Sequence, residues 1–391
     1  MNRGEEMTKA SFALRGATVL PITSEPIDNG VVVVQDGKIT AVGGADTAIP
    51  AGIDVTDVGG KWVVPGLIDA HAHVGVSEEA EGWAGSDINE TTDPVTSNVR
   101  ALDAINPAEE GFRDAIAGGV LAVNVNPGSG NVIGGETVAL KVDGRSVDEM
   151  VLRSPSGVKA ALGENPKRVY GDKKITPSTR LGTAAVLRGA FVDAQNYMAK
   201  QAAATDDKPA ERDLKMESLV KVLKREIPWR QHCHRADDIA TAMRVAEEFG
   251  YELVLDHGTE AHLLSDVVAE RGIPVIIGPL LTARRKVELR NRSLANPGKL
   301  NRAGVTVAIT TDHPVVPINH LITQVILSVK EGYDRASALE TVTINPARIM
   351  GVDDRLGSLD VGKDADLCVW SGDPLDIYSQ VETAFIEGQE V

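Results

Sequence analysis

The sequence contains little cysteine, and Cys233 and Cys368 are the only two in 391 residues. Two cysteines are too few for a disulfide framework or for a structural zinc site made of thiolates. Small disulfide-rich and zinc-stapled proteins are therefore excluded as classes. The scarcity of cysteine is typical of a reducing compartment, so we expect a cytoplasmic protein.

Long apolar runs are also missing. No stretch approaches the ~18 consecutive apolar residues that a membrane-spanning helix needs. The first nine residues are polar and lack the apolar segment of a secretory signal. We therefore expect no membrane span and no secretion.

Positive charge is in deficit, with 40 Lys and Arg against 56 Asp and Glu, which gives a net charge of −16. A negative surface repels nucleic acids and anionic membranes, so we expect neither as a partner. Acidic charge is also ordinary for soluble enzymes, so it names no partner by itself. The residues discussed below predict a small-molecule substrate, and whether the chain forms a homo-oligomer is left open.

The length suits two structural parts. With 42% hydrophobic residues, 391 residues can build a barrel of about 250 residues and a smaller domain beside it. Both ends of the chain have sequence patterns typical of β-strands. The β-rich run 30–34 precedes the hairpin signal Asp36-Gly37, and another apolar run covers residues 366–370. We therefore predict one β-sandwich domain built from residues 10–60 and 352–391.

The middle of the chain, residues 61–351, alternates apolar runs with helical periods, which is the mark of βα units. Ile239, Ala242, Met243, Ala246 and Phe249, for example, predict a helix that stops at Gly250. We predict a (β/α)8 TIM-type barrel, although the pattern alone also fits an open doubly wound sheet. The eight predicted strands are 62–68, 120–125, 137–142, 157–162, 227–232, 252–257, 273–277 and 305–310.

Histidine and aspartate side chains follow several of these strands. His71-Ala72-His73 follows the first, and residues two apart in a strand point to the same side. The carboxyl ends of barrel strands form the active-site face, and imidazoles and carboxylates are ligands that Zn²⁺, Mn²⁺ and Fe²⁺ accept. We predict a divalent metal centre there, with Zn²⁺ as the first candidate and the choice between one and two ions left open. The predicted ligands at these strand ends are His71, His73, His232, His257 and Asp312.

These motifs resemble the amidohydrolase superfamily. The resemblance rests on His71-Ala72-His73 after a Pro-Gly-Leu-Ile-Asp run, on His232, His257 and Asp312 on later strands, and on the ending over residues 357–367. The most similar branch is that of the imidazolonepropionase-like amidohydrolases. The resemblance implies a (β/α)8 barrel, a β-sandwich from both termini, one or two divalent metals, and Asp312 as the aspartate that shuttles a proton.

The fourth strand offers two candidate ligands. Some members of the superfamily place a carboxylated lysine there as a bridge between two metals, and others use a glutamate. Lys159 lies near the start of the predicted strand 157–162, whereas Glu164 follows its exit, where ligands belong. We therefore predict Glu164, rather than Lys159, as the fourth-strand metal ligand.

Other residues are predicted to contact the substrate. His232 is favoured over His234 as a metal ligand because it ends the strand, which leaves His234 for the substrate, for a second metal or for a supporting role. Arg168 and His313 are further predicted substrate contacts, and Arg284-Arg285-Lys286 is another basic segment that could bind a substrate carboxylate. A solvated or ion-paired role fits these basic residues equally well.

The glycine-rich segment 128–135 lacks the spacing of a dinucleotide-binding fingerprint, so a dehydrogenase is disfavoured and we expect a loop at the active site.

We predict a metal-dependent hydrolase that cleaves an amide-type C–N bond in a dipeptide, an N-acyl amine or a cyclic amide. A divalent metal lowers the pKa of the water that it binds. Asp312 would take the proton of this water as general base and deliver it to the leaving nitrogen as general acid. Deamination of a small heterocycle is the alternative, weakened by Arg235 at the position where many deaminases of the superfamily carry a glutamate. A non-catalytic scaffold is the third hypothesis, and the intact His71, His73 and Asp312 argue against it.

Overall fold

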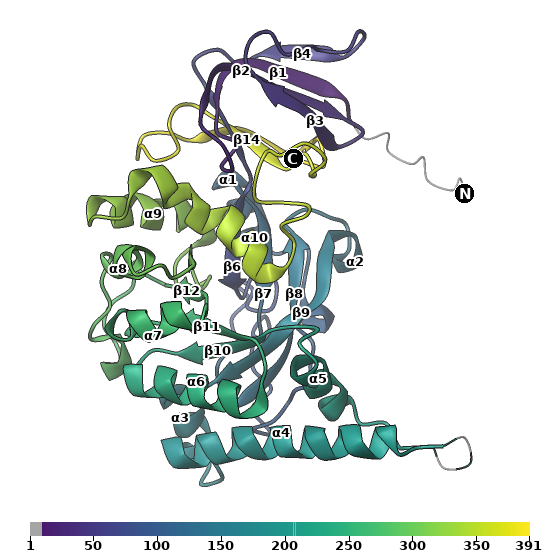
Figure 1. The fold of residues 1–391 in the computed structure, drawn as a ribbon, viewed down its shortest axis with the longest axis vertical. Coiled ribbons are helices and arrows are strands. Elements are labelled where there is room, and N and C mark those ends of the chain that lie inside the picture. Colours follow the sequence, from purple (N-terminus) through teal and green to yellow (C-terminus); the bar gives the residue numbers. More distant parts are fainter. Residues whose placement is uncertain (1–9, 206, 208) are drawn as a thin grey trace.

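The computed structural model describes residues 10–205, 207 and 209–391. Residues 1–9, on which the expectation of no secretory signal rests, lie outside the described residues, as do positions 206 and 208 of the polar segment after 202. Figure 1 shows two parts: a sheet at one end of the molecule, in which the purple and yellow ends of the chain lie together, and a barrel with helices around it. The long helix α4 crosses the opposite end.

Both ends of the chain build one sheet, which we call the terminal sheet. Its order is β16-β15-β14-β5-β1-β2-β3, and β4 pairs with β1. Asp36 and Gly37 take positive φ values of 51° and 74°, as a tight hairpin between β2 and β3 requires. The prediction that both termini build one β-structure is thus confirmed. Its strands are β1 (Phe12–Val19), β2 (Ile27–Gln35), β3 (Lys38–Gly43), β4 (Asp54–Asp57), β5 (Trp62–Pro65), β14 (Leu367–Trp370), β15 (Val381–Ile386) and β16 (Gln389–Glu390).

The second sheet is a nearly closed barrel of eight strands in the order β13-β12-β11-β10-β9-β8-β7-β6. The side chains of Asp69, two residues before His71 on β6, and of Thr310, after β13, are hydrogen-bonded and link the two ends of this order. The predicted barrel is confirmed. Its strands are β6 (Leu67–Ala72), β7 (Val120–Val125), β8 (Ile133–Lys141), β9 (Val151–Ala161), β10 (Trp229–Cys233), β11 (Leu253–His257), β12 (Val275–Ile277) and β13 (Val307–Ile309).

The helices pack apolar faces on the barrel. In α6, Ile239, Ala242 and Met243 are buried, and Gly250 ends the helix at φ 75°, as predicted. Within the described residues, no helix is long and apolar enough to cross a membrane. The α-helices are α1 (Glu110–Ala117), α2 (Val147–Met150), α3 (Glu164–Asp172), α4 (Arg180–Ala202), α5 (Leu214–Leu223), α6 (Ala236–Phe249), α7 (Ser265–Glu270), α8 (Asn296–Arg302), α9 (Leu321–Lys330) and α10 (Ile344–Met350), and the short 3-10 helices are η1 (Ala101–Ala104), η2 (Ala261–Leu263), η3 (Val287–Leu289), η4 (Ile318–His320) and η5 (Arg335–Val342).

The prediction of one strand over 62–68 is wrong. The chain leaves the terminal sheet after β5 and enters the barrel with β6, and the break falls at Gly66. A Cβ atom on Gly66 would lie 2.6 Å from Leu121 Cδ1, so the backbone passes β7 more closely than a side chain allows. The terminal sheet therefore extends past the predicted boundary at residue 60.

The barrel is not built from eight parallel units, because β8 runs antiparallel to both β7 and β9. Only residues 126–132 connect β7 to β8, which is too short for a crossover between parallel strands, since such crossovers need a dozen residues or more. The fourth predicted strand also begins earlier than expected, at Val151 rather than at 157. This shift moves Lys159 from the start of its strand to a position near the exit.

Candidate active site

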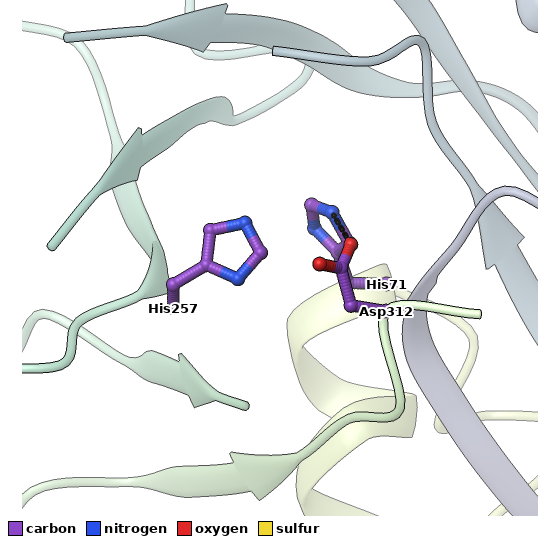
Figure 2. A group of neighbouring side chains, drawn as sticks. All are labelled: His71, His257 and Asp312. Atoms are coloured by element: carbon purple, nitrogen blue, oxygen red, sulfur yellow. Dashed lines mark ion pairs between the residues drawn. The ribbon is translucent and has the colours of Figure 1, made fainter. Parts of the chain in front are cut away.

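Three predicted ligands converge at the carboxyl ends of barrel strands. His71 lies near the end of β6, His257 is the last residue of β11, and Asp312 follows β13. One ligand atom of each lies within 4.8 Å of one ligand atom of the others, and Figure 2 shows the three side chains facing a common space. We call these three residues the first ligand group. His73 lies beside them, with its Nε2 3.2 Å from Asp312 Oδ1, while His71 Nε2 is 3.4 Å from the same oxygen.

Backbone carbonyls fix the orientation of two of the imidazoles. His73 Nδ1 lies 2.7 Å from the carbonyl oxygen of Asn126, and His257 Nδ1 lies 2.8 Å from that of Gly278. A carbonyl oxygen only accepts, so in each ring Nδ1 carries the proton and donates. The Nε2 atoms are left as the lone-pair donors, which is the arrangement of metal-binding histidines.

The backbone is strained at two of the ligands. His257 has φ 70° and Asp312 has φ 54°, in the left-handed region that residues other than glycine seldom adopt. Such conformations cost about 1–3 kcal/mol and persist where the surrounding structure holds them, often at functional sites. Here they turn both side chains into the common space as their strands end.

Buried charges lie beneath the first ligand group. Asp256 Oδ2 is 3.1 Å from His71 Nδ1, and its Oδ1 is 3.2 Å from Arg230 Nη2. Lys159 Nζ is 3.1 Å from His71 Nε2 and 3.7 Å from Asp256 Oδ2. All four residues are fully buried. His71 is therefore held on one side by a carboxylate and on the other by an amine.

Four buried histidines of the candidate site, His73, His232, His234 and His257, have lowered pKa values and are uncharged at neutral pH. Burial lowers the pKa of His257 to about 4. Burial, together with the nearby His257, holds the pKa values of His232 and His234 well below the ordinary value. Burial also lowers the pKa of His73. Neutral imidazoles are the form that binds metal.

Asp312 is ionised, and Lys159 has a lowered pKa. Burial by itself would raise the pKa of Asp312, but His257, His71 and His73 outweigh it and hold that pKa well below the ordinary value. Burial lowers the pKa of Lys159 to about 8 despite the nearby Asp256 and Asp312. The site thus contains a carboxylate, neutral imidazoles and an amine that titrates close to neutrality.

A second group of potential ligands lies next to the first. His232 and His234 come with Glu288, which lies on η3, and one ligand atom of each lies within 4.8 Å of the others. We call these three residues the second ligand group. The ring centroids of His232 and His257 are 4.5 Å apart, so the two groups adjoin.

The geometry does not support the reason for preferring Glu164 over Lys159. Lys159 points into the barrel against His71, whereas Glu164 begins α3 and is in neither ligand group. The backbone N–H of Glu164 donates to Glu288 Oε1 at 2.6 Å. The preference came from the predicted strand start, which was six residues late relative to Val151.

The predicted substrate contacts are spread more widely. Arg168 is exposed on α3 and makes no ion pair with a described residue. His313 is fully buried, its backbone carbonyl accepts from the backbone N–H of His73 at 2.9 Å, and its Nε2 lies 4.0 Å from Glu79 Oε1. His234 lies within the second ligand group, as described above.

Basic and glycine-rich segments do reach the site. Lys286 Nζ donates to Asn165 Oδ1 at 2.5 Å, and Asn165 Nδ2 lies 2.8 Å from Ser129 Oγ and 3.4 Å from His232 Nε2. The loop that contains Ser129 therefore lies at the site, as the glycine-rich segment 128–135 was predicted to do.

The sequence reading missed Asp256, Arg230 and Glu288. Asp256 and Arg230 had a usable signal, because a charged residue inside an apolar barrel strand needs a buried partner. Glu288 had none, since it lies in a polar loop between two strands and resembles any other surface glutamate.

Comparison with protein-family models gives a match over residues 62–390, and the model is described as the amidohydrolase family. The chain is 29% identical over 388 residues to amidohydrolase tasK of Hapsidospora irregularis, which covers 92% of this chain but only 39% of that protein. It is 26% identical over 380 residues to the imidazolonepropionase of Mesorhizobium japonicum, which covers 88% of this chain and 87% of the relative.

Solved structures give matches to the whole fold. The crystal structure of an amidohydrolase from Thermotoga maritima MSB8 has a TM-score of 0.94 and 46% identity, and the match covers 97% of this chain and 99% of that one. A prolidase crystallised with N-methylphosphonate-L-proline has a TM-score of 0.64 at 19% identity, covering 98% of this chain and 99% of that one, and shares the fold alone.

Proposed function

The chain belongs to the amidohydrolase family, in its imidazolonepropionase-like branch, and is a hydrolase acting on carbon–nitrogen bonds; from this premise we propose that it cleaves an amide-type bond of a small molecule with the help of a divalent metal. The proposed substrates are a dipeptide, an N-acyl amine or a cyclic amide. The observation that carries the proposal is the convergence of the first ligand group at the exits of three strands.

The donor set fits a divalent ion. His71, His73 and His257 offer imidazole nitrogens and Asp312 offers a carboxylate oxygen, the ligands that Zn²⁺ takes in catalytic sites. We propose that these four residues hold the ion, with Zn²⁺ first and Mn²⁺ or Fe²⁺ as alternatives. When bound, the ion would lower the pKa of a water molecule and polarise the substrate carbonyl.

Asp312 is the residue that we propose moves the proton. Its pKa lies well below the ordinary value, so the side chain is a carboxylate at neutral pH and can accept a proton from water. The same oxygen can then deliver that proton to the nitrogen that leaves, as general base and then general acid. With its backbone at φ 54°, Asp312 holds this carboxylate beside His71 and His73.

Lys159 replaces Glu164 in the proposal as the fourth-strand residue of the site. Its amine lies 3.1 Å from His71 Nε2, inside the barrel. Because its pKa is about 8, a fraction of the amine is uncharged at neutral pH, and an uncharged amine is the form that can become carboxylated. The resemblance to the superfamily implies that a carboxylated lysine would bridge two metals.

The position of Lys286 favours a substrate that carries a negatively charged group. Its ammonium lies at the mouth of the site on Asn165, and it forms no ion pair with a carboxylate of the described residues. A substrate carboxylate placed there would gain a charge-assisted hydrogen bond. This position favours dipeptides and N-acyl amino acids over uncharged amides.

A hydrolysis screen tests the proposal. Zinc-loaded protein would be assayed against dipeptides, N-acyl amino acids and cyclic amides, each with and without a free carboxylate, by following both products. We expect turnover that disappears after chelation and returns with Zn²⁺. Release of ammonia without a second organic fragment would instead establish deamination, and metal-independent turnover would contradict the proposal.

A further inference from the structure

A cleft of about 860 Å³ lies at the end of the barrel opposite the two ligand groups, where β10, β11 and β12 begin and α10 ends. We propose that this cleft binds a small organic molecule with two or more anionic groups, phosphate or carboxylate. Active sites of such barrels lie at the carboxyl ends of the strands, so this ligand would bind away from the reacting atoms. Binding at the cleft does not depend on the proposed hydrolase function.

Arginines from separate segments gather in the cleft, although the chain as a whole has a net charge of −16. Three of them, Arg153, Arg225 and Arg348, form no ion pair with a carboxylate of the described residues, and Arg348 also makes no side-chain hydrogen bond there. Guanidinium groups match carboxylate and phosphate oxygens in geometry and charge. The four arginines of the lining are Arg153 on β9, Arg225 before β10, Arg271 after α7 and Arg348 on α10.

Backbone carbonyls hold two of these guanidinium groups in place. Arg153 Nη1 donates to the carbonyl oxygen of Met350 and its Nη2 donates to that of Glu226, both at 3.0 Å. Arg225 Nε donates to the carbonyl oxygen of Gly250 at 2.7 Å. A guanidinium has more N–H donors than these bonds use, and a carbonyl does not neutralise its charge. Both side chains are therefore positioned before a ligand arrives, which lowers the entropic cost of binding an anion.

The backbone is shaped around the same two arginines. Gly351 has φ 68°, and a Cβ atom at this position would collide with Arg153 Nη1. Arg225 itself has φ 58°, in the left-handed region that residues other than glycine seldom adopt. Such a conformation costs free energy and often marks a functional site. A tight turn at Arg225 and the absence of a side chain at Gly351 thus accompany the two guanidinium groups that the carbonyls hold.

The rest of the lining limits the class of ligand. Glu247 pairs with Arg271 at 3.3 Å, and Glu226 and Glu252 also line the cleft, so the excess of positive charge is small. Together with the acidic surface, this opposes the binding of nucleic acid. The volume is typical of small-molecule sites and exceeds that of one phosphate, so the three guanidinium groups without a carboxylate partner favour a ligand with more than one anionic group. Its neutral part would contact the buried apolar residues of the lining, which include Leu253, Ile273 and Ile349.

Calorimetric titration of the zinc-loaded full chain tests for this site, with fructose 1,6-bisphosphate as the phosphate probe and glutarate as the carboxylate probe. We expect saturable binding of at least one probe, and the probe that binds identifies the anionic group. Arg348→Gln and Arg153→Gln should each raise the Kd by about 10-fold or more, because each removes charge-assisted hydrogen bonds. Arg113→Gln is the control and should leave the Kd unchanged, since Arg113 is an exposed arginine of α1 that pairs with Glu110 outside the cleft.

Repeating the titration after chelation separates the cleft from the active site. Binding at the cleft should persist without zinc. Binding that disappears on chelation and is unchanged in Arg348→Gln would place the anion at the active site and overturn the proposal, as would the absence of saturable binding of both probes at millimolar concentration. Circular dichroism verifies folding. If Arg153→Gln does not fold, because it loses its bonds to Met350 and Glu226, Arg348→Gln decides the outcome, since Arg348 is exposed and makes no side-chain hydrogen bond with a described residue.

Discussion

Asp312 combines contacts to two histidines with a backbone conformation that aspartate tolerates but seldom adopts. Its Oδ1 lies 3.4 Å from His71 Nε2 and 3.2 Å from His73 Nε2, and its φ is 54°. Asparagine also tolerates this conformation and has the same shape. It cannot accept a proton in the same way, which separates the chemical role of Asp312 from a structural role in the turn.

We predict that Asp312→Asn folds, keeps much of its metal and loses kcat by about 10²–10⁴-fold, the usual contribution of a positioned general base. Steady-state kinetics and zinc content measured on the same sample provide the test. Turnover within about threefold of wild type would leave less than ~1 kcal/mol for the proton transfer and would assign Asp312 to the turn.

Asp256 contacts the proposed metal ligand His71 and is not itself a proposed ligand. Its Oδ2 lies 3.1 Å from His71 Nδ1, and Arg230, its other partner, is fully buried. Burial alone would raise the pKa of Asp256, but Arg230 and His71 hold it well below the ordinary value, so the group is a carboxylate. A carboxylate at this distance favours the proton on His71 Nδ1, which leaves Nε2 for the site.

Asp256→Asn should weaken zinc binding by about 10–100-fold, the usual effect of losing a carboxylate behind a ligating histidine. The amide retains an oxygen for Arg230 but has no charge. Competition with a zinc chelator measures the affinity, and Asp103→Asn, which changes an exposed ion pair with Arg100, is the control. An unchanged affinity in a folded Asp256→Asn protein would show that Asp256 only packs the barrel.

At the scale of elements, Lys141 joins the barrel to the terminal sheet. It ends β8, and its Nζ lies 2.8 Å from Asp364 Oδ2 and 2.9 Å from Asp366 Oδ1, just before β14. All three side chains are at most 6% exposed. Removing one partner of a buried pair leaves an uncompensated charge, which is far more costly than losing a surface pair.

Lys141→Met should lower the free energy of unfolding by about 3–5 kcal/mol. Lys61→Met is the control, because Lys61 pairs with Glu382 on the same sheet but is 40% exposed, and its loss should cost about 1 kcal/mol or less. Urea unfolding of both variants measures the difference. Equal effects in the two variants would mean that the buried cluster adds no more than a surface pair.

At the scale of the whole molecule, the buried ion pairs of Lys141 with Asp364 and Asp366 predict how stability depends on pH. Burial would raise the pKa of Asp364, but Lys141, Lys38 and Arg355 hold it at about 2, below the ordinary 3.8. A carboxyl group whose pKa is depressed in the folded state stabilises the protein above its unfolded pKa, and this stabilisation is lost as the pH falls through the folded pKa. The contribution of Asp364 should therefore be complete above about pH 4 and disappear toward pH 2.

The variant Asp364→Asn isolates this effect because an amide does not titrate. The difference in unfolding free energy between wild type and Asp364→Asn should be constant from pH 5 to 7 and shrink as the pH falls from about 4 to 2. Urea unfolding at each pH measures it. A difference that stays constant down to pH 2 would show that Asp364 contributes by shape alone.

The terminal sheet also makes the fold depend on both ends of the chain. β14 pairs with β5, the strand that leads directly into β6 and His71, and Leu367 and Trp370 are buried. Deleting residues 362–391 should therefore give an unfolded or aggregated protein that binds little zinc. A soluble, cooperatively unfolding truncated protein with unchanged metal content would contradict this dependence.

Local patterns were enough to predict much of this protein from its sequence. The period of apolar residues predicted the barrel and its helices, and Asp36-Gly37 predicted a hairpin. Strand-like sequence patterns at both ends of the chain predicted a shared β-structure. Because strand ends in a barrel meet at one face, residues at the ends of strands, such as His71, His257 and Asp312, could be assigned to one site before any distance was known. These features depend on residues close together in the chain.

Only the tertiary structure decided which residues fill the space around these histidines. Lys159 and Glu164 differ by five positions, and the start of β9 at Val151 places Lys159 against His71, a contact that the predicted strand start did not indicate. Glu288 lies close to His232 although it comes from a distant segment, because Gly163 in the neighbouring turn leaves room for the Glu288 carboxylate. Periodicity encodes the direction of a side chain relative to its own element. The partner that it meets depends on how separate elements pack, and no local pattern records that packing.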